Sequence, residues 1–313
     1  MVLSIGVDVG GTKIAAGVVD EDGQVLTTIR RPSPANEREQ ISRTIADMAN
    51  ELAAEYDVAC VGIGAAGFVA ADRATIAYGT NLDWTGEPLG EKVSALCNLP
   101  VVVENDANAA GWAEHRFGAA KGKNDALIVT LGTGVGGAIV VNGELCRGGA
   151  GFASEIGHIM AVPGGRHCGC GQRGCLERYC SGTALAANAR ERAQSLPELC
   201  PEMIAAANGD ADKITGLCVL KAARRGEQAA LDSFHELAHY LGAGLATLAA
   251  VTDPEVIVLA GGLIDSAEFF LEETRESFTQ HLTARAHRPK IPIVLAQAGA
   301  HAGLVGAADL ARQ

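Results

Sequence analysis

Residues 3–29 read LSIGVDVGGTKIAAGVVDEDGQVLTTI, and this stretch decides the fold. Its apolar runs predict strands over 3–8, 14–19 and 25–29. The glycines at 10 and 11 allow a tight corner between the first two strands, and Asp22-Gly23 is a typical hairpin turn between the second and third. The stretch therefore predicts a buried strand, a glycine-rich corner and a β-hairpin.

The same order of elements returns near the middle of the chain. Residues 126–131 (ALIVTL) predict a strand, 132–137 (GTGVGG) a corner, and 138–141 a strand that turns at Asn142-Gly143 and resumes at Glu144. Helices and parallel-type strands follow in each half, expected over 37–55, 58–64 and 101–103 in the first and over 228–250, 256–260 and 291–295 in the second. We predict a duplicated α/β fold whose two domains flank a cleft. The first domain should span 1–118, and the second 119–298; the last segment, 299–313, contains a helix expected at 301–312 that packs back on the first domain.

Composition limits the possible partners. The chain has 313 residues, of which 48% are hydrophobic, and no apolar run approaches the roughly 20 residues that cross a bilayer. Met1 precedes the first strand almost directly, without a basic leader, so we expect a cytoplasmic protein. A net charge of −12 and 4% aromatic residues argue against nucleic acid. We therefore expect small polar substrates, no nucleic acid and no membrane.

Residues 158–177 (HIMAVPGGRHCGCGQRGCLE) contain a metal motif. His158, Cys168, Cys170 and Cys175 supply the four ligands of a closed tetrahedral site, which predicts a structural zinc ion. His167 is the alternative histidine ligand, although its adjacency to Cys168 makes tetrahedral geometry awkward. The remaining cysteines are predicted to be inert thiols: Cys60, Cys97, Cys146, Cys180, Cys200 and Cys218.

Two carboxylates flank the motif. Glu155 lies three residues before His158, and Glu177 two residues after Cys175. They are either solvated charges or, since the metal loop is rigid, groups fixed in place to bind hydroxyls.

Three glycine clusters are candidate phosphate sites. Glycines let phosphate approach backbone N–H groups, and the first cluster adds a hydroxyl and an ammonium group. Ordinary turns also use glycine, but repetition in the two halves favours a pair of corners that hold a polyphosphate. The pattern matches neither a Walker motif nor a dinucleotide site. The residues predicted to contact the nucleotide are Asp8, Gly10, Gly11, Thr12, Lys13, Gly132, Thr133, Gly134, Gly261 and Gly262.

A carboxylate at the end of a strand is the candidate for chemistry. Residues 101–106 (VVVEND) lead into a helix expected over 107–117, which puts Asp106 at its start. Asp106 can be a helix N-cap, a general base, or both, because a helix N-terminus favours the ionised carboxylate that a base requires. Asn105 beside it is placed to orient a hydroxyl.

Taken in order, these motifs resemble the ROK family of sugar kinases and sugar-responsive repressors over nearly the whole chain. Within that family the sequence is most similar to ATP-dependent glucokinases of the actinobacterial type. The segments that carry the resemblance are 8–13 (DVGGTK), 104–106 (END), 131–134 (LGTG), 155–158 (EIGH), 168–177 (CGCGQRGCLE), 81–84 (NLDW) and 303–308 (GLVGAA).

The resemblance implies an actin-like ATPase fold, which is ribonuclease H-like in each domain, and transfer of phosphate from ATP to the 6-hydroxyl of glucose. It implies Asp106 as the base, Asp8 near Mg²⁺, and Thr12, Thr133 and the Gly261-Gly262 turn on the nucleotide side. It also implies a homodimer or homotetramer. The residues implied for the sugar are Gly67, Asn105, Asp106, Glu155, His158 and Glu177.

Several alternatives stay open at this point. Kinases for fructose, mannose, N-acetylmannosamine or allose share these motifs, and polyphosphate replaces ATP in some relatives. A sugar-responsive repressor would carry an additional N-terminal DNA-binding segment, whereas Asp8 lies close to the start of this chain. A catalytically silent sugar-binding module is disfavoured by Asp106 and the two glycine corners.

Overall fold

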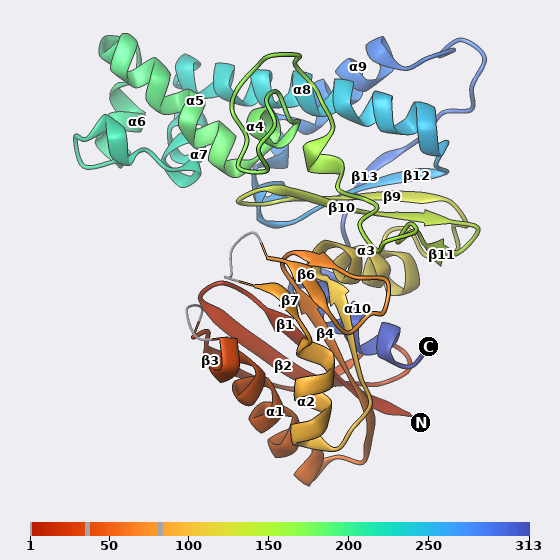
Figure 1. Ribbon diagram of the computed structural model, residues 1–313. Helices are drawn as coiled ribbons and strands as arrows, with labels where there is room; N and C mark the ends of the chain where they lie inside the picture. The colour runs from red at the N-terminus through yellow and green to blue at the C-terminus, as the bar shows by residue number, and fades with distance from the viewer. Residues whose placement is uncertain (1, 35–37, 80–83) are drawn as a thin grey trace.

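The computed structural model describes residues 2–34, 38–79 and 84–313, which form two lobes stacked one above the other (Figure 1). Of the expected motif 81–84, Asn81 to Asp83 lie outside the described residues. Across the described residues, no helix combines the length and hydropathy of a bilayer-spanning segment.

Each lobe is built on a five-stranded sheet of the same design. The first has the order β3-β2-β1-β4-β8 and the second β11-β10-β9-β12-β13. In both, the first three strands of the lobe pair antiparallel and the last two add in parallel. The predicted duplication is therefore confirmed. The bounds are β1 (Leu3–Val9), β2 (Lys13–Val19), β3 (Val25–Pro32), β4 (Val58–Ala65), β8 (Val101–Asn105), β9 (Ala126–Leu131), β10 (Val135–Val141), β11 (Glu144–Leu145), β12 (Val256–Ala260) and β13 (Ile293–Leu295).

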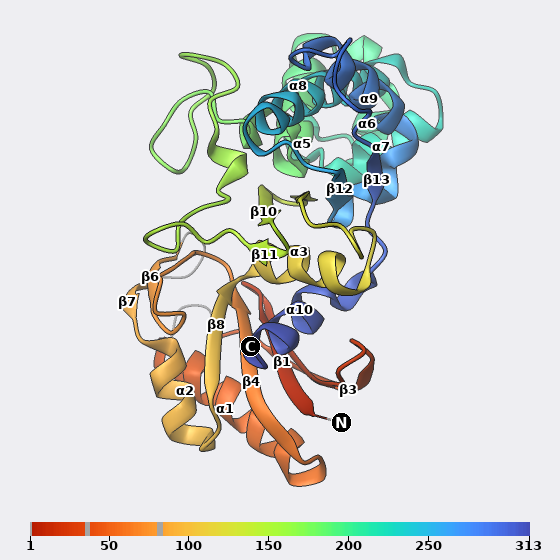
Figure 2. The same cartoon turned by 90° about the vertical axis from the view of Figure 1, so that its right-hand side faces the viewer.

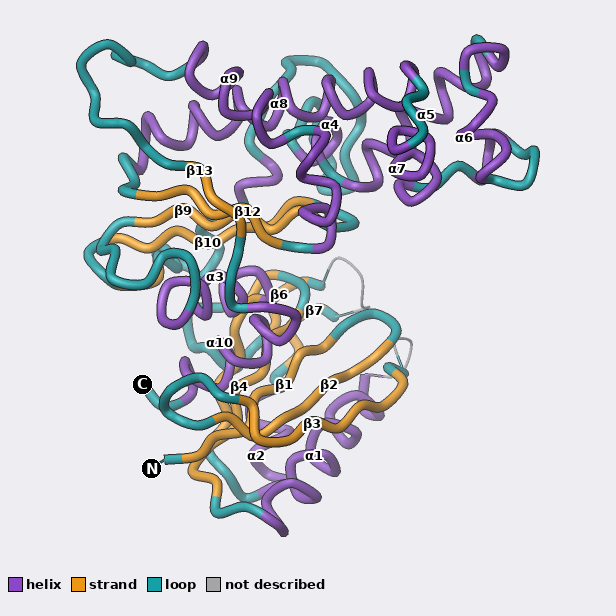
Figure 3. Tube along the Cα trace, turned by 180° about the vertical axis from the view of Figure 1, so that it is seen from behind, coloured by secondary structure: helices purple, strands orange, loops and turns teal. Residues whose placement is uncertain are grey.

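Helices cover both sheets (Figure 3). In the first lobe, α1 (Arg38–Glu55) and α2 (Leu89–Cys97) share a buried apolar core with β1, β2 and β4. A small sheet of β5 (Phe68–Val69), β6 (Ile76–Tyr78) and β7 (Thr85–Glu87) lies at the top of this lobe. The second lobe carries α4 (Glu177–Cys180), α5 (Gly182–Ser195), α6 (Pro201–Ala206), α7 (Gly216–Arg224), α8 (Gln228–Thr252) and α9 (Leu271–His281). Short 3₁₀ segments are η1 (Ile156–His158), η2 (Pro197–Leu199), η3 (Ala211–Lys213), η4 (Gly262–Phe269) and η5 (Gly299–His301).

Some predicted bounds were wrong, for identifiable reasons. The strand expected over 138–141 begins at Val135, because Gly136 and Gly137 pair with Thr130 and Val129 instead of turning. The strand expected over 291–295 begins at Ile293, because Pro292 has no N–H to donate.

Between the lobes lie α3 (Asp106–Phe117) and α10 (Ala302–Ala311) (Figure 2). Helix α10 lies directly on the first sheet, because a side chain on Gly6 or Gly62 would overlap its backbone. A Cβ at Gly62 would sit 1.8 Å from the carbonyl oxygen of Ala307. The domain boundary between residues 118 and 119 stays a prediction.

Replacing Gly62 with alanine should lower the free energy of unfolding by about 1–3 kcal/mol, because α10 must move away from β4. Thermal unfolding followed by circular dichroism measures the effect. The matched control is Gly149→Ala, since Gly149 is exposed and its added Cβ would meet no atom within 4 Å. Equal melting temperatures for the two variants would contradict this account of the α10 contact.

Candidate functional site

A cleft of about 490 Å³ lies between the lobes and gathers most of the predicted residues. Those that line it are Asp8, Gly10, Gly11, Gly67, Asn105, Asp106, Gly132, Thr133, Gly134, Glu155, His158, Glu177 and Gly261. Of the residues predicted to bind sugar or nucleotide, three do not line it. Thr12 and Lys13 are exposed at the start of β2, and Gly262 lines an adjoining hollow.

Asp106 is the first residue of α3, and Asn105 is its N-cap. The Asn105 side chain accepts a hydrogen bond from the Asn108 N–H at 3.0 Å, so the interpretation of Asp106 as the cap was wrong. The carboxylate of Asp106 accepts the Ala107 N–H at 2.9 Å. Burial raises its pKa despite this bond, so desolvation outweighs the helix terminus that was expected to favour the ionised form.

Gly67 acts on Asn105 through its backbone. Asn105 Nδ2 donates to the Gly67 carbonyl at 3.1 Å, which holds the amide at the cleft wall. Gly67 has φ +132°, and a Cβ there would lie 2.6 Å from the carbonyl oxygen of Tyr78. Only glycine therefore fits this position.

Glu104 was assigned no role from the sequence, although it is the first residue of the END motif. It is buried and accepts hydrogen bonds from the Asn105 N–H at 3.1 Å, from Asn108 Nδ2 at 3.0 Å and from Arg147 Nε at 2.7 Å. Arg147 belongs to the loop of the second lobe that leads to Glu155. The pair therefore joins the two lobes directly beside Asp106.

Asp8 faces the same cleft from the end of β1. Burial is the largest cause that raises the pKa of Asp8, and the charge of Asp106 raises it further. The charges of Lys13 and His301 lower it. Two carboxylates that repel each other across a cleft of this kind fit a divalent cation with oxygen ligands. Asp8 is therefore the candidate ligand for Mg²⁺.

The zinc motif folds into a compact cluster. The ligand atoms of His158, Cys168, Cys170 and Cys175 all lie within 4.8 Å of one another. His158 Nδ1 lies 3.6 Å from Cys168 Sγ, and Cys170 Sγ lies 3.6 Å from Cys175 Sγ. These distances match the edge of about 3.7 Å that Zn–S bonds of about 2.3 Å produce in a tetrahedron. The four residues fit a structural zinc ion, and His167 lies outside the cluster.

The protonation of the cluster also fits a metal. Burial, together with the neighbouring Cys170 and Cys168 thiols, raises the pKa of Cys175 to about 12. A cation is therefore needed to stabilise the thiolate. A zinc ion bound through Nδ1 of His158 would leave the Nε2–H group free to donate a hydrogen bond in the cleft that this residue lines.

Glu177 joins the zinc loop to the glycine corner at 132–134. Its Oε2 accepts the Val135 N–H at 3.0 Å, directly after Gly134, and its Oε1 lies 4.0 Å from Cys168 Sγ. Glu155 lies on the same wall, where burial raises its pKa, His158 lowers it, and Asp106 and Glu177 raise it further. Both carboxylates are half-buried at the cleft and are not free surface charges.

A second hollow of about 600 Å³ adjoins the cleft through Gly132 and Thr133. The Gly182 N–H donates to the Gly132 carbonyl at 2.8 Å, and Thr183 Oγ1 donates to the Thr133 carbonyl at 2.7 Å. Sequence reasoning missed this hollow. The available signal was a pair of helix starts, Ser181-Gly182 and Thr215-Gly216, whose hydroxyls cap α5 and α7.

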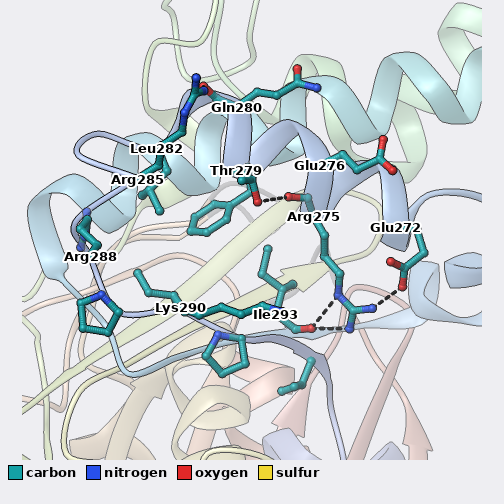
Figure 4. A pocket seen from close by; sticks show the side chains of 15 residues that line it. Glu272, Arg275, Glu276, Thr279, Gln280, Leu282, Arg285, Arg288, Lys290 and Ile293 are labelled. Atoms are coloured by element: carbon teal, nitrogen blue, oxygen red, sulfur yellow. Dashed lines mark hydrogen bonds and ion pairs between the residues drawn. The ribbon is translucent and has the colours of Figure 1, made fainter.

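A larger hollow of about 830 Å³ lies away from the cleft, between α9 and residues 289–294 (Figure 4). Its arginines already have partners within the protein: Arg275 donates to the Ile293 carbonyl at 2.6 Å, and Arg288 pairs with Asp253. None of the predicted site residues lines it.

Replacing Cys170 with serine should remove stoichiometric zinc, because a neutral hydroxyl is a poor substitute for a thiolate ligand. The metal content of the purified protein, measured by mass spectrometry, checks this directly. Cys146→Ser is the matched control, since Cys146 lies outside the cluster, and it should keep one zinc per chain. A Cys170→Ser protein with full zinc would show that the cluster does not hold the ion.

The chain is similar to known proteins over nearly its whole length. The chain is 48% identical to a glucokinase of Streptomyces coelicolor over 313 residues, which is 100% of this chain and 98% of that protein. A ROK family glucokinase of Streptomyces griseus, solved in complex with glucose and AMPPNP, superposes with a TM-score of 0.89 at 49% identity and covers 99% of both chains. A ROK hexokinase of Thermus thermophilus superposes with a TM-score of 0.80 at 33% identity, covering 98% of this chain and 97% of that one.

The family model for ROK proteins matches residues 4–313. This match and the duplicated sheets confirm the expected actin-like fold. The chain belongs to the ROK family.

Proposed function

We propose that this protein is a glucokinase, which transfers the γ-phosphoryl group of ATP to the 6-hydroxyl of glucose. One observation carries the proposal: Asp106, the zinc-held His158 and the corner 132–134 all line one cleft. The similarity to a glucokinase that binds glucose and AMPPNP supports the choice of substrates. From the resemblance of the motifs to those of ROK kinases, we also propose a cytoplasmic homodimer or homotetramer.

The sugar would be held by groups from both lobes. The first lobe offers Asn105 and Asp106, and the second offers Glu155, His158 and Glu177. Glucose presents hydroxyl groups that both donate and accept, so it needs the mixture of carboxylates, an amide and an imidazole N–H that lines this cleft. Gly67 would contribute indirectly, because its carbonyl fixes the amide of Asn105.

The nucleotide would lie between the two glycine corners, which follow the central strands β1 and β9. The backbone N–H groups of Gly11, Thr133 and Gly134 would bind phosphate oxygens. Those of Gly10 and Gly132 shape the two corners instead, because they donate to the carbonyls of Lys13 and Gly134 at 3.0 Å each. Gly261 and Gly262 stand where the cleft meets the hollow beside α5 and α7, which would take the nucleoside. Thr12 and Lys13, which are exposed beside the first corner, would reach the phosphates from outside the cleft.

The chemical step assigns a proton to Asp106. As the 6-hydroxyl oxygen forms a bond to the γ-phosphorus, the Asp106 carboxylate accepts the hydroxyl proton, and the bond from the γ-phosphorus to the bridging oxygen breaks to release ADP. Burial raises the pKa of Asp106, which makes it a stronger base than an ordinary aspartate. Mg²⁺ held near Asp8 supplies neutralisation of the triphosphate charge.

Water competes with the sugar for the phosphoryl group. Closure of the lobes over the bound sugar would exclude it, because the hydroxyl-binding residues come from both sides of the cleft. ATP hydrolysis without sugar should accordingly be slow.

Replacing Asp106 with asparagine should lower kcat at least about 100-fold, because the amide accepts the Ala107 N–H but cannot take a proton. A coupled assay for ADP with glucose measures turnover, and calorimetry measures retained glucose binding. The control is Asp47→Asn on the exposed side of α1. Near-normal turnover of Asp106→Asn would remove the base assignment. A panel of hexoses, with ATP and with polyphosphate, identifies the preferred substrates in the same assay.

Replacing Glu177 with glutamine should raise KM for glucose more than KM for ATP. The glutamine carbonyl still accepts the Val135 N–H and so preserves the corner, whereas a neutral amide binds sugar hydroxyls less strongly. Steady-state kinetics with each substrate varied separately distinguish the two constants. Glu144→Gln on the exposed hairpin serves as the control. Equal increases in both constants would argue against a sugar role.

A further inference from the structure

Glu114 is a buried carboxylate that the reaction does not use. It lies on α3, eight residues after Asp106, which is about 12 Å along the helix. Its exposed fraction is 1%. A charge at this depth requires strong partners, so its hydrogen bonds indicate what it does.

Both carboxylate oxygens of Glu114 accept hydrogen bonds from the backbone. Oε2 accepts the Ala119 N–H at 2.8 Å, and Oε1 accepts the Ala298 N–H at 2.7 Å. The Gln297 N–H lies 3.0 Å from each oxygen. The donors come from two segments that are nearly 180 residues apart in the sequence.

These two segments are the places where the chain passes between the sheets. After Gly118 the chain leaves α3 for β9 of the second sheet, and residues 296–298 lead from β13 back to α10 on the first (Figure 2). One side chain therefore binds both passages. Any rotation of one lobe against the other has to bend the backbone at these two places.

The helix that carries Glu114 packs against both sides. A Cβ on Gly111 would lie 2.3 Å from Ala138 Cβ of β10, and a Cβ on Gly306 of α10 would lie 1.7 Å from the Ala109 carbonyl oxygen. Because α3 is a rigid element, its orientation sets the place of Asp106 relative to the corner 132–134. A displacement of α3 at Glu114 therefore also moves Asp106 at the other end of the helix.

We propose that Glu114 is a positioning residue for phosphoryl transfer: it clamps both inter-lobe passages to α3 and so fixes the hinge about which the cleft closes. The proposal rests on the function proposed above. The site requires a carboxylate, because every partner is an N–H donor. An amide would turn its own N–H₂ toward at least one donor.

The first test compares Glu114→Gln with Glu227→Gln. Glu227 is also buried and also accepts backbone N–H groups, from Glu202 at 2.6 Å and Met203 at 3.4 Å, but all its partners lie within the second lobe. Both variants are expected to lose stability. Assayed well below their melting temperatures, only Glu114→Gln should lower kcat, by at least about tenfold, because small misplacements of reacting groups are costly.

The decisive readout is the ratio of ATP hydrolysed to glucose phosphorylated. A loosened hinge admits water to the cleft, so this ratio should rise about tenfold in Glu114→Gln and stay unchanged in Glu227→Gln. A loss of folded protein alone would lower both reactions in parallel. A kcat within twofold of wild type with an unchanged ratio, or equal changes in the two variants, would overturn the proposal.

A second variant covers the case in which Glu114→Gln does not fold. Gly118 has φ −113°, and an added Cβ would lie 2.1 Å from Glu114 Oε2, so Gly118→Ala displaces the carboxylate without removing it. It should reproduce the raised ratio, and where the double variant folds it should add little to Glu114→Gln, since both act on one contact. A Gly118→Ala enzyme with the wild-type ratio would overturn the proposal.

Small-angle scattering separates this inference from the proposed function. Without ligand, Glu114→Gln or Gly118→Ala should have a larger radius of gyration than wild type, and Glu227→Gln should not. This outcome does not depend on the substrate. If wild type fails to phosphorylate glucose while the scattering differs as expected, the proposed function is wrong and the hinge role stands; identical scattering for all variants would refute the hinge.

Discussion

The packing of α3 between the two sheets is the constraint on which the site depends. The helix lies within contact of β10 on one side and α10 on the other, and small residues make both approaches possible. A Cβ on Gly136 would lie 2.8 Å from Ala107 Cβ, so a side chain on this strand would push away the first turn of the helix. That first turn carries Asp106. The close approach therefore sets the position of Asp106, the proposed base, relative to the corner at 132–134.

The zinc site is the second feature that positions side chains at the cleft. Residues 146–176 contain little regular structure, and such a segment would not hold Glu155 and His158, which are proposed to bind sugar, in place by its own packing. Metal coordination at His158 and the three cysteines fixes the loop at its centre. Glu177 then connects it to β10 through the Val135 N–H. One carboxylate thus links the zinc loop to the strand that follows the corner at 132–134.

Local patterns in the sequence were sufficient for the architecture and for most of the cleft. Two glycine corners at equivalent places, a Cys/His spacing and an acid after a buried strand each have short-range signatures. Contacts made at long range have none. Glu104 binds Arg147, and Glu114 binds residues 297 and 298, yet nothing in the sequence near either acid indicates those partners. Gly136 and Gly137 were interpreted as turn residues because their role, close approach to α3 and Ile156, appears only in three dimensions.

The duplicated halves have sheets of the same design, but their central strands, β1 and β9, differ in charge near their carboxyl ends. Asp8 lies two residues before Gly10, and the equivalent residue before Gly132 is Thr130, which also lines the cleft. A carboxylate in place of Thr130 would be the fifth in the cleft, after Asp8, Asp106, Glu155 and Glu177. It would raise the pKa of Asp8 and Asp106 further and would repel a triphosphate, in a chain whose net charge is already −12. The first lobe therefore carries the acids that a metal and a proton transfer require. At the equivalent position the second lobe presents neutral hydroxyl and N–H groups, which would bind phosphate without adding to that repulsion. Its two carboxylates, Glu155 and Glu177, line the cleft on the side of the zinc loop.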